Sequence, residues 1–282
     1  MIRLLAIDID GTLLDSRGRI PDSHRRALGD AAARGVAIAL ATGRSFHFTR
    51  PIAEALGLPV TMIVNNGAMV KSGTGATLLR RLLPKEAALA ILAGTRAFED
   101  SVAVVFDRHD ERQIVFEHMD WTHPHRKGYY EKNRAFIAAA SSLVDAVTED
   151  PVQVMFTGGV TRMRALASGL RAMPIADRVS VALTEYELRD FSLVDVNDAG
   201  CSKGSTLAQW AATRGVNPAE VMAVGDNLND VEMLDFAGTP VVMGNAAEGL
   251  RTRGFHLTAS NDQDGLAAAI DHFILSTPTP AP

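Results

Sequence analysis

Short, uninterrupted apolar runs alternate with helical patterns through most of this chain, and no other feature constrains its fold as strongly. Six runs have the composition of buried strands: RLLAIDI, VAIALA, VTMIV, VMAVG, PVVM and FHLTA. Helical segments lie between them, among them residues 21–34 and 203–215, where a glycine closes each helix. Apolar strands that alternate with helices are typical of a parallel sheet covered on both faces. The sequence therefore predicts an α/β fold with a Rossmann-like, doubly wound parallel sheet.

The middle of the chain has a different pattern. A predicted helix begins at residue 84, and the strand-like segments SVAVVFD and RQIVFEH follow, separated by the polar turn at residues 108–110. VQVMFTG, RVSVAL and FSLVDV complete the region. Adjacent strands without helices between them favour antiparallel pairing. We therefore expect an inserted α+β domain at residues 84–190, a core at residues 1–83 and 191–275, and a disordered tail at residues 276–282.

Length and composition limit the class of protein. A chain of 282 residues, of which 47% are hydrophobic, is long enough for roughly two domains with a large core. Its formal net charge of -5 offers no basic surface for nucleic acid. No stretch reaches the roughly 18 apolar residues of a membrane span, and the N-terminus has no signal-peptide pattern. We expect a soluble cytoplasmic protein that binds neither nucleic acid nor a membrane.

Polar residues follow several of the predicted core strands. Asp8 and Asp10 end the first strand, Thr42 follows the second, and Asp226 follows VMAVG. In a doubly wound sheet the carboxyl ends of the strands line one crevice, so these side chains are expected to meet there. Alternatively, Asp8 and Asp10 lie at a solvent-exposed strand end, where Asp10 and Gly11 form a turn. Clustered carboxylates need a cation, and hard oxygen ligands suit Mg²⁺.

The remaining polar groups at these strand ends suit a phosphate. Lys203 supplies a positive charge at a helix start, although an exposed lysine is an equally common reading of that position. The Thr42 hydroxyl, the Ile9 and Gly43 amides and the Asn229 side chain are further donors.

A carboxylate can attack phosphorus, and a second one two residues on can exchange protons with the leaving group and water. Asp8 is therefore predicted as the nucleophile and Asp10 as the acid/base.

Four motifs occur in order along the chain: DIDGTL at residues 8–13, TGR at 42–44, SKG at 202–204 and GDNLND at 225–230. With NNGA at 65–68 and MGNA at 243–246, they make the chain resemble the haloacid dehalogenase superfamily, in its Cof-type branch of phosphatases with a large C2-type α/β cap. The resemblance implies that the inserted domain is the cap. It also implies that Asp10 gives its backbone carbonyl to Mg²⁺, that Asp8 and Asp226 are direct ligands, and that Asp230 orients the waters of the metal or Lys203.

Within the inserted domain, residues 118–130 (HMDWTHPHRKGYY) concentrate aromatic and histidine side chains. A metal pair of His123 and His125 would lack a nearby carboxylate or Cys to complete it. The segment is either packed within the cap or faces a substrate. In the second case Trp121, Tyr129 and Tyr130 are candidate specificity residues.

The sequence thus predicts a magnesium-dependent phosphatase that hydrolyses small phosphorylated metabolites, with sugar phosphates favoured, through an aspartyl-phosphate intermediate. Two alternatives stay open. One is a phosphomutase or phosphotransferase that uses the same nucleophile, and the other is a non-catalytic binding protein with this fold. The sequence makes no prediction of the oligomeric state.

Overall fold

The computed structural model describes residues 1–108 and 112–276, and the chain divides into two compact units. The core unit comprises Met1–Arg80 and the chain from Ser202 onward, and the inserted unit comprises Arg81–Cys201. Most of the predicted tail (277–282 of 276–282) and most of the predicted polar turn (109–110 of 108–110) lie outside the described residues.

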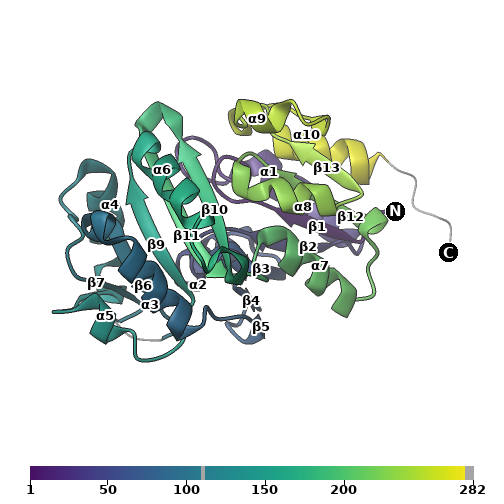
Figure 1. Ribbon diagram of the computed structural model, residues 1–282. Helices are drawn as coiled ribbons and strands as arrows, with labels where there is room; N and C mark the ends of the chain where they lie inside the picture. The colour runs from purple at the N-terminus through teal and green to yellow at the C-terminus, as the bar shows by residue number, and fades with distance from the viewer. Residues whose placement is uncertain (109–111, 277–282) are drawn as a thin grey trace. The chain divides into compact units, whose positions relative to one another are not determined.

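Within the described residues, the core unit is built on an eight-stranded sheet with helices on both faces (Figure 1). In spatial order the strands are β14 (His256–Leu257), β13 (Thr239–Val242), β12 (Val221–Gly225), β1 (Leu4–Ile7), β2 (Ala37–Ala41), β3 (Val60–Val64), β4 (Met69–Lys71) and β5 (Thr77–Arg80). Neighbours from β14 to β3 are parallel, which confirms the predicted fold class. The antiparallel edge formed by β4 and β5 was not predicted.

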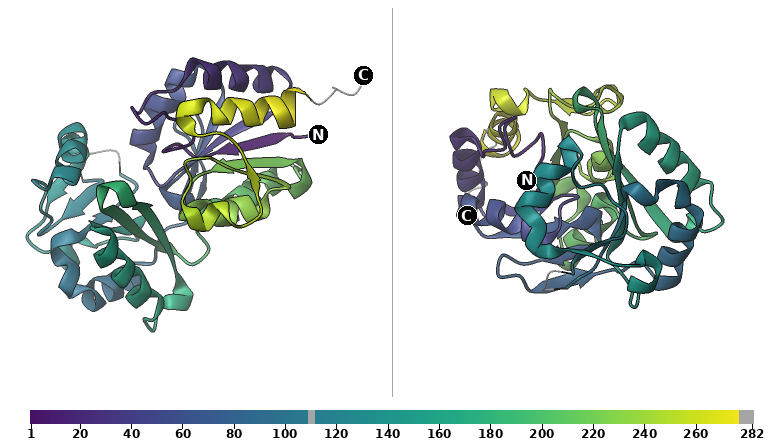
Figure 2. Two further views of the ribbon diagram at one scale, coloured as in Figure 1. Left: turned by 90° about the horizontal axis from the view of Figure 1, so that it is seen from above. Right: turned by 90° about the vertical axis from the view of Figure 1, so that its left-hand side faces the viewer.

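Helices bury both faces of this sheet. α1 (Asp22–Ala33) and α10 (Gly265–Ile270) contact each other on one side, and α7 (Lys203–Thr213) and α8 (Val231–Phe236) on the other (Figure 2, left). The core unit also contains α2 (Phe46–Leu56) and α9 (Glu248–Arg251). Side chains of β1 alternate between the two faces, and all four are buried, so this strand is central. The buried β1 holds the residues that follow it in fixed positions.

The inserted unit contains a six-stranded sheet among its described residues. Its spatial order is β10 (Val179–Tyr186), β11 (Phe191–Asp198), β9 (Gln153–Gly158), β6 (Val102–Val105), β7 (Ile114–Phe116) and β8 (Ile137–Ala139). Its helices are α3 (Lys85–Gly94), α4 (Pro124–Asn133), α5 (Leu143–Ala146) and α6 (Val160–Arg171). Pairing is antiparallel, as predicted, except that β7 and β8 are parallel. The apolar faces of α3 and α6 pack on one side of this sheet, around Phe156 and Val194.

The boundaries of the inserted unit differ from the predicted residues 84 and 190. The first lies at Arg81, three residues earlier, and the second lies at Cys201 because β11 belongs to this unit. β11 pairs with both β10 and β9, and its Val194 and Val196 side chains are buried in the same apolar cluster as α3 and α6. An apolar strand alone does not specify which of two sheets it joins, so the sequence placed the boundary before β11.

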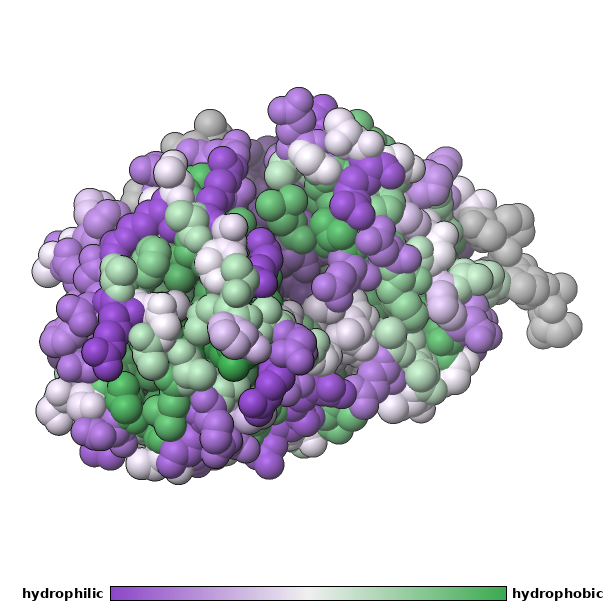
Figure 3. Space-filling model, viewed as in Figure 1, coloured by the Kyte–Doolittle hydropathy of each residue, from purple (hydrophilic) through white to green (hydrophobic). Residues whose placement is uncertain are grey.

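Hydrophobic residues occur in small groups between hydrophilic ones over the face drawn in Figure 3. The large hydrophobic side chains that are exposed among the described residues come from separate segments: Met1, Leu78, Val144, Leu228 and Leu257. Among the same residues, no helix has the length and apolar character needed to cross a membrane.

Candidate active site

The candidate active site lies in the core unit, where β1 and β12 end. Asp8 follows β1 directly, and its backbone N–H donates to the Val224 carbonyl at 3.0 Å. Asp226 follows β12. Because β1 and β12 are parallel neighbours, the two aspartates leave the sheet at the same edge, as the sequence predicted.

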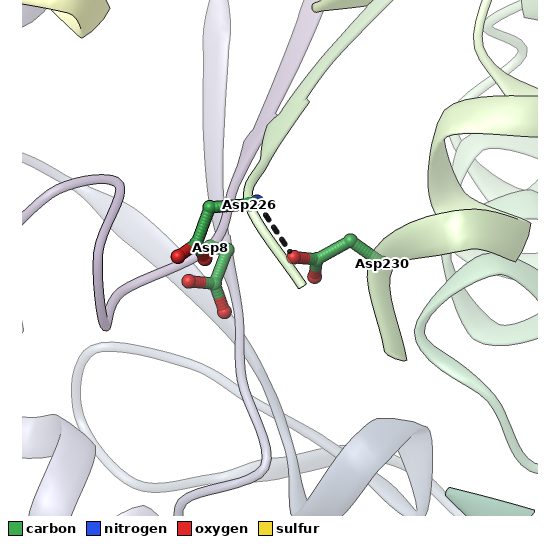
Figure 4. A group of neighbouring side chains, drawn as sticks. All are labelled: Asp8, Asp226 and Asp230. Carbon is green, nitrogen blue, oxygen red and sulfur yellow. Dashed lines mark hydrogen bonds between the residues drawn. The ribbon is translucent and has the colours of Figure 1, made fainter. Parts of the chain in front are cut away.

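Three carboxylates form the centre of the site (Figure 4), and one ammonium group contacts two of them. Asp8, Asp226 and Asp230 each offer an oxygen, and these oxygens lie within 4.8 Å of one another. The Lys203 Nζ atom donates to Asp8 Oδ1 at 2.6 Å and to Asp230 Oδ1 at 2.7 Å. Asp230 Oδ2 accepts from the backbone N–H groups of Asp226 and Asn227, both at 3.0 Å. Lys203 is only 1% exposed, so the reading of it as an ordinary surface lysine is wrong.

Burial sets the electrostatics of this group. Desolvation raises the pKa of the Asp8 carboxyl from 3.8 to about 7, although the Lys203 ammonium acts in the opposite direction. Desolvation also raises the pKa of Asp226 well above 3.8, and the charges of Asp8 and Asp230 raise it further. Burial lowers the pKa of Lys203, but the contacts with Asp230 and Asp8 outweigh this and raise it. Lys203 therefore stays charged, but its single positive charge does not balance the negative charges of the three carboxylates.

The donor set fits a divalent cation. Three carboxylates face a single lysine, and Asp226 Oδ1 is buried without a hydrogen-bond partner in the described part of the chain. Hard carboxylate oxygens at this density are the ligands that Mg²⁺ accepts. A cation here would also remove the cause of the raised pKa values of Asp8 and Asp226.

The Asp10 side chain is not among the carboxylates whose oxygens lie within 4.8 Å of one another, but its charge helps to raise the pKa of Asp8 and of Asp226. Its two oxygens accept from Arg44 Nε at 2.7 Å and from Arg44 Nη2 at 2.6 Å. Both side chains are 34% exposed. A bidentate arginine–carboxylate pair fixes the orientation of the carboxylate as well as its charge. The sequence contained the signal, since Arg44 ends the TGR motif, but it gave that residue no role.

Two of the predicted phosphate donors, Thr42 and Asn229, lie in the segments that follow β2 and β12. Thr42 is buried, and its hydroxyl accepts from the backbone N–H of Arg44 at 3.1 Å. Asn229 Nδ2 donates to Asn66 Oδ1 at 3.0 Å. A Cβ added to Gly43 would lie 3.2 Å from Asn66 Nδ2, so this glycine lets the two segments approach each other.

Asn66 was missed as a site residue, although NNGA was singled out as a motif. It has φ of +52°, in the left-handed region that non-glycine residues rarely adopt. Ile9, by contrast, is fully buried, and its carbonyl accepts from Leu14 N at 3.0 Å in the tight turn after Asp8.

Among the three aromatic candidates of the inserted unit, Trp121 contacts the other two. The Trp121 ring stacks on Tyr129 with centroids 6.3 Å apart, and it lies 5.4 Å from Tyr130 and 5.4 Å from Phe116. All three rings are half-buried, so they pack on one another and keep part of their surface exposed. The side chain of His125, the proposed partner of His123, lies outside the described residues.

Known proteins resemble this chain over nearly its whole length. The family model of haloacid dehalogenase-like hydrolases matches residues 5–270. The chain belongs to this family. The resemblance inferred from the four motifs is therefore confirmed, and this haloacid dehalogenase-like hydrolase is an enzyme of the hydrolase class.

Relatives and a solved structure agree with this assignment. The hydrolase is 30% identical to the HMP-PP phosphatase of Serratia proteamaculans, over 98% of this chain and 97% of the relative. It is 28% identical to the 5-amino-6-(5-phospho-D-ribitylamino)uracil phosphatase YcsE of Bacillus subtilis, over 97% of this chain and 96% of the relative. A solved haloacid dehalogenase subclass IIB sugar phosphatase superposes with a TM-score of 0.77 at 25% identity, covering 96% of this chain and 98% of its own.

Proposed function

We propose that this hydrolase is a magnesium-dependent phosphatase of small phosphorylated metabolites, with sugar phosphates as the favoured class. The observation that carries the proposal is the buried group of Asp8, Lys203, Asp226 and Asp230 at the carboxyl ends of two neighbouring strands. The proposal is supported by the phosphatase names of the two relatives and by the sugar phosphatase structure.

Asp8 is the proposed nucleophile. One of its carboxylate oxygens attacks phosphorus, so that an Asp8–phosphate bond forms while the bond from phosphorus to the leaving oxygen breaks. The Lys203 ammonium contacts Asp8 at 2.6 Å, where it opposes protonation of the carboxylate and offsets negative charge that gathers on the phosphoryl group. Asp230 holds Lys203 from the other side.

Asp10 is the proposed acid/base. It gives a proton to the leaving oxygen, and it then takes a proton from the water that breaks the Asp8–phosphate bond. The bidentate contact with Arg44 fixes the carboxylate at the edge of the site, and proton transfer requires that one oxygen exchange this contact for one with the substrate. Arg44 is thus a proposed positioning residue.

Asp8, Asp226 and the Asp10 backbone carbonyl are the proposed Mg²⁺ ligands, and Asp230 supports Lys203 beside them. When bound there, Mg²⁺ would polarise the phosphoryl oxygens and neutralise the carboxylates. Thr42, Asn229 and the amides of Ile9 and Gly43 are the proposed contacts to the phosphate.

The decisive experiment measures phosphate release from a panel of phosphorylated metabolites. We expect release of free phosphate that stops on exhaustive chelation and returns with Mg²⁺. Asp8→Asn should be folded and inactive, because an amide cannot form the acyl phosphate. Asp235→Asn is the matched control, since the Asp235 side chain on α8 is half exposed and pairs with Arg253 at 3.4 Å.

Each other outcome contradicts the proposal in a different way. An isomerised sugar phosphate without free phosphate would identify a phosphomutase. Binding without turnover of any ester would identify a non-catalytic protein. Full activity of Asp8→Asn would remove that residue from the role of nucleophile.

A further inference from the structure

Asn245 lies in the loop that follows β13, and its side chain makes three polar contacts, one of them with Asp226. Its Nδ2 atom donates to the Gly11 carbonyl at 2.9 Å and approaches Asp226 Oδ2 at 3.4 Å. Its Oδ1 atom accepts from the backbone N–H of Asn261 at 2.9 Å. The residue is nevertheless exposed, so it contributes little to the apolar core.

The loop around Asn245 is attached to the segment that carries Asp226. The N–H of Met243 donates to the Gly225 carbonyl at 3.1 Å, and the N–H of Ala247 donates to the Asp226 carbonyl at 3.1 Å. On its other side the loop packs closely on a second segment, because a Cβ added to Gly244 would lie 2.9 Å from the backbone nitrogen of Ser260. The backbone thus holds Asn245 beside Asp226 independently of the Asn245 side chain.

Gly11 and Asp226, the two residues that Asn245 Nδ2 contacts, also lie directly against each other. Gly11 has φ of +85°, and a Cβ at this position would lie 2.2 Å from Asp226 Oδ2. The turn after Asp10 therefore packs its backbone against the Asp226 carboxylate. A single amide group, Asn245 Nδ2, spans the two partners of this contact.

We propose that Asn245 is a positioning residue that orients the Asp226 carboxylate toward Mg²⁺ and ties it to the turn that carries Asp10. This inference rests on the proposed function. Asp226 Oδ1 has no hydrogen-bond partner among the described residues, so the contact from Asn245 to Oδ2 restrains the plane of the carboxylate from one side. A metal-binding carboxylate that is held in this way has one orientation before the cation arrives.

The test is calorimetric titration of Mg²⁺ into the metal-free, full-length protein without substrate. Asn245→Leu keeps roughly the size of the side chain but removes both polar groups, and Asn245→Ala removes them and shortens the side chain. We expect each to weaken Mg²⁺ binding roughly 10- to 100-fold, as loss of an outer-shell partner of a metal ligand does. Substrate KM at saturating Mg²⁺ should change much less than the Mg²⁺ dissociation constant.

Asn217→Ala is the matched control. Asn217 is an exposed asparagine of the same unit, and it forms a capping box with Glu220. It should lose some thermal stability and keep the wild-type affinity for Mg²⁺. Wild-type affinity in both Asn245 variants would overturn this inference alone, because the wild-type protein would still bind Mg²⁺ and release phosphate. A wild-type protein that neither binds Mg²⁺ nor releases phosphate would overturn the proposed function and this inference with it.

Discussion

Replacing Asp230 by asparagine removes the charge that holds Lys203 while keeping the size of the side chain. Asp230 is fully buried, and its two oxygens accept three hydrogen bonds, from Lys203 Nζ at 2.7 Å and from two backbone N–H groups at 3.0 Å. Asparagine has one acceptor oxygen. If that oxygen faces the backbone N–H groups, the amide nitrogen faces the lysine ammonium, and two donors then oppose each other.

The structure sets the size of the effect. A hydrogen bond to a charged group contributes about 1.5–3 kcal/mol, and a buried donor left without a partner costs about 1–3 kcal/mol more. Together these effects amount to about 2.5–6 kcal/mol, and the loss of repulsion between Asp230 and the carboxylates of Asp8 and Asp226 offsets part of them. We therefore expect Asp230→Asn to lower the free energy of unfolding by about 2–4 kcal/mol. For a unit of this size that corresponds to a Tm lower by roughly 5–15 °C.

Thermal unfolding followed by circular dichroism, in chelator at neutral pH, measures this difference. Asp235→Asn provides the comparison, since Asp235 is half exposed and its contact with Arg253 is 3.4 Å long. An exposed pair of this kind contributes less than about 1 kcal/mol, so this Tm should stay within a few degrees of wild type. A Tm of Asp230→Asn that matches that of Asp235→Asn would refute the view that the buried Lys203–Asp230 pair stabilises the site.

Three further measurements test other parts of the structure. Burial lowers the pKa of His24 below 6.5, so its contribution to stability is complete above pH 6.5 and is lost as the pH falls below that value. His24→Asn keeps a donor for the Leu13 carbonyl but does not titrate, so its Tm should fall less than the wild-type Tm between pH 7 and pH 5. Equal falls in Tm would contradict this. Arg44→Lys keeps the positive charge but loses the bidentate contact with Asp10, so we expect kcat to fall roughly 10- to 100-fold with a shifted pH–rate profile, and an unchanged profile would remove Arg44 from the positioning role. Trp121→Ala should raise KM for the best natural substrate and leave acetyl phosphate hydrolysis nearly unchanged. Equal changes in kinetic constants on both substrates, or no change on either, would show that other residues determine specificity.

The strands that position the site were predictable because a strand that is buried on both faces consists almost entirely of apolar residues. β1 and β12 are continuous apolar runs, and the rule that parallel strands end at one edge brings Asp8 and Asp226 together. Lys203 was placed at a helix start, and the structure adds a capping box at Ser202 that begins α7 there.

The parts that escaped prediction depend on contacts between segments rather than on local pattern. The exposed strand β5 has no apolar run to reveal it, and β11 has one that does not specify its sheet. The bond between Arg44 and Asp10 depends on the path of two loops that follow different strands. The sequence does not predict this ion pair, because Asp10 and Arg44 are each equally compatible with an exposed position.

The discontinuity of the core unit has a consequence for the order in which the chain folds during synthesis. β1 lies between β2 and β12, so one edge of the central strand stays open until residues beyond 220 have left the ribosome. The inserted unit is continuous in sequence from Arg81 to Cys201, and all six strands of its sheet have emerged by then. Domains whose contacts are complete fold as units during translation. We therefore expect the inserted unit to fold first, and Lys203 to reach Asp8 only when the last third of the chain closes the sheet.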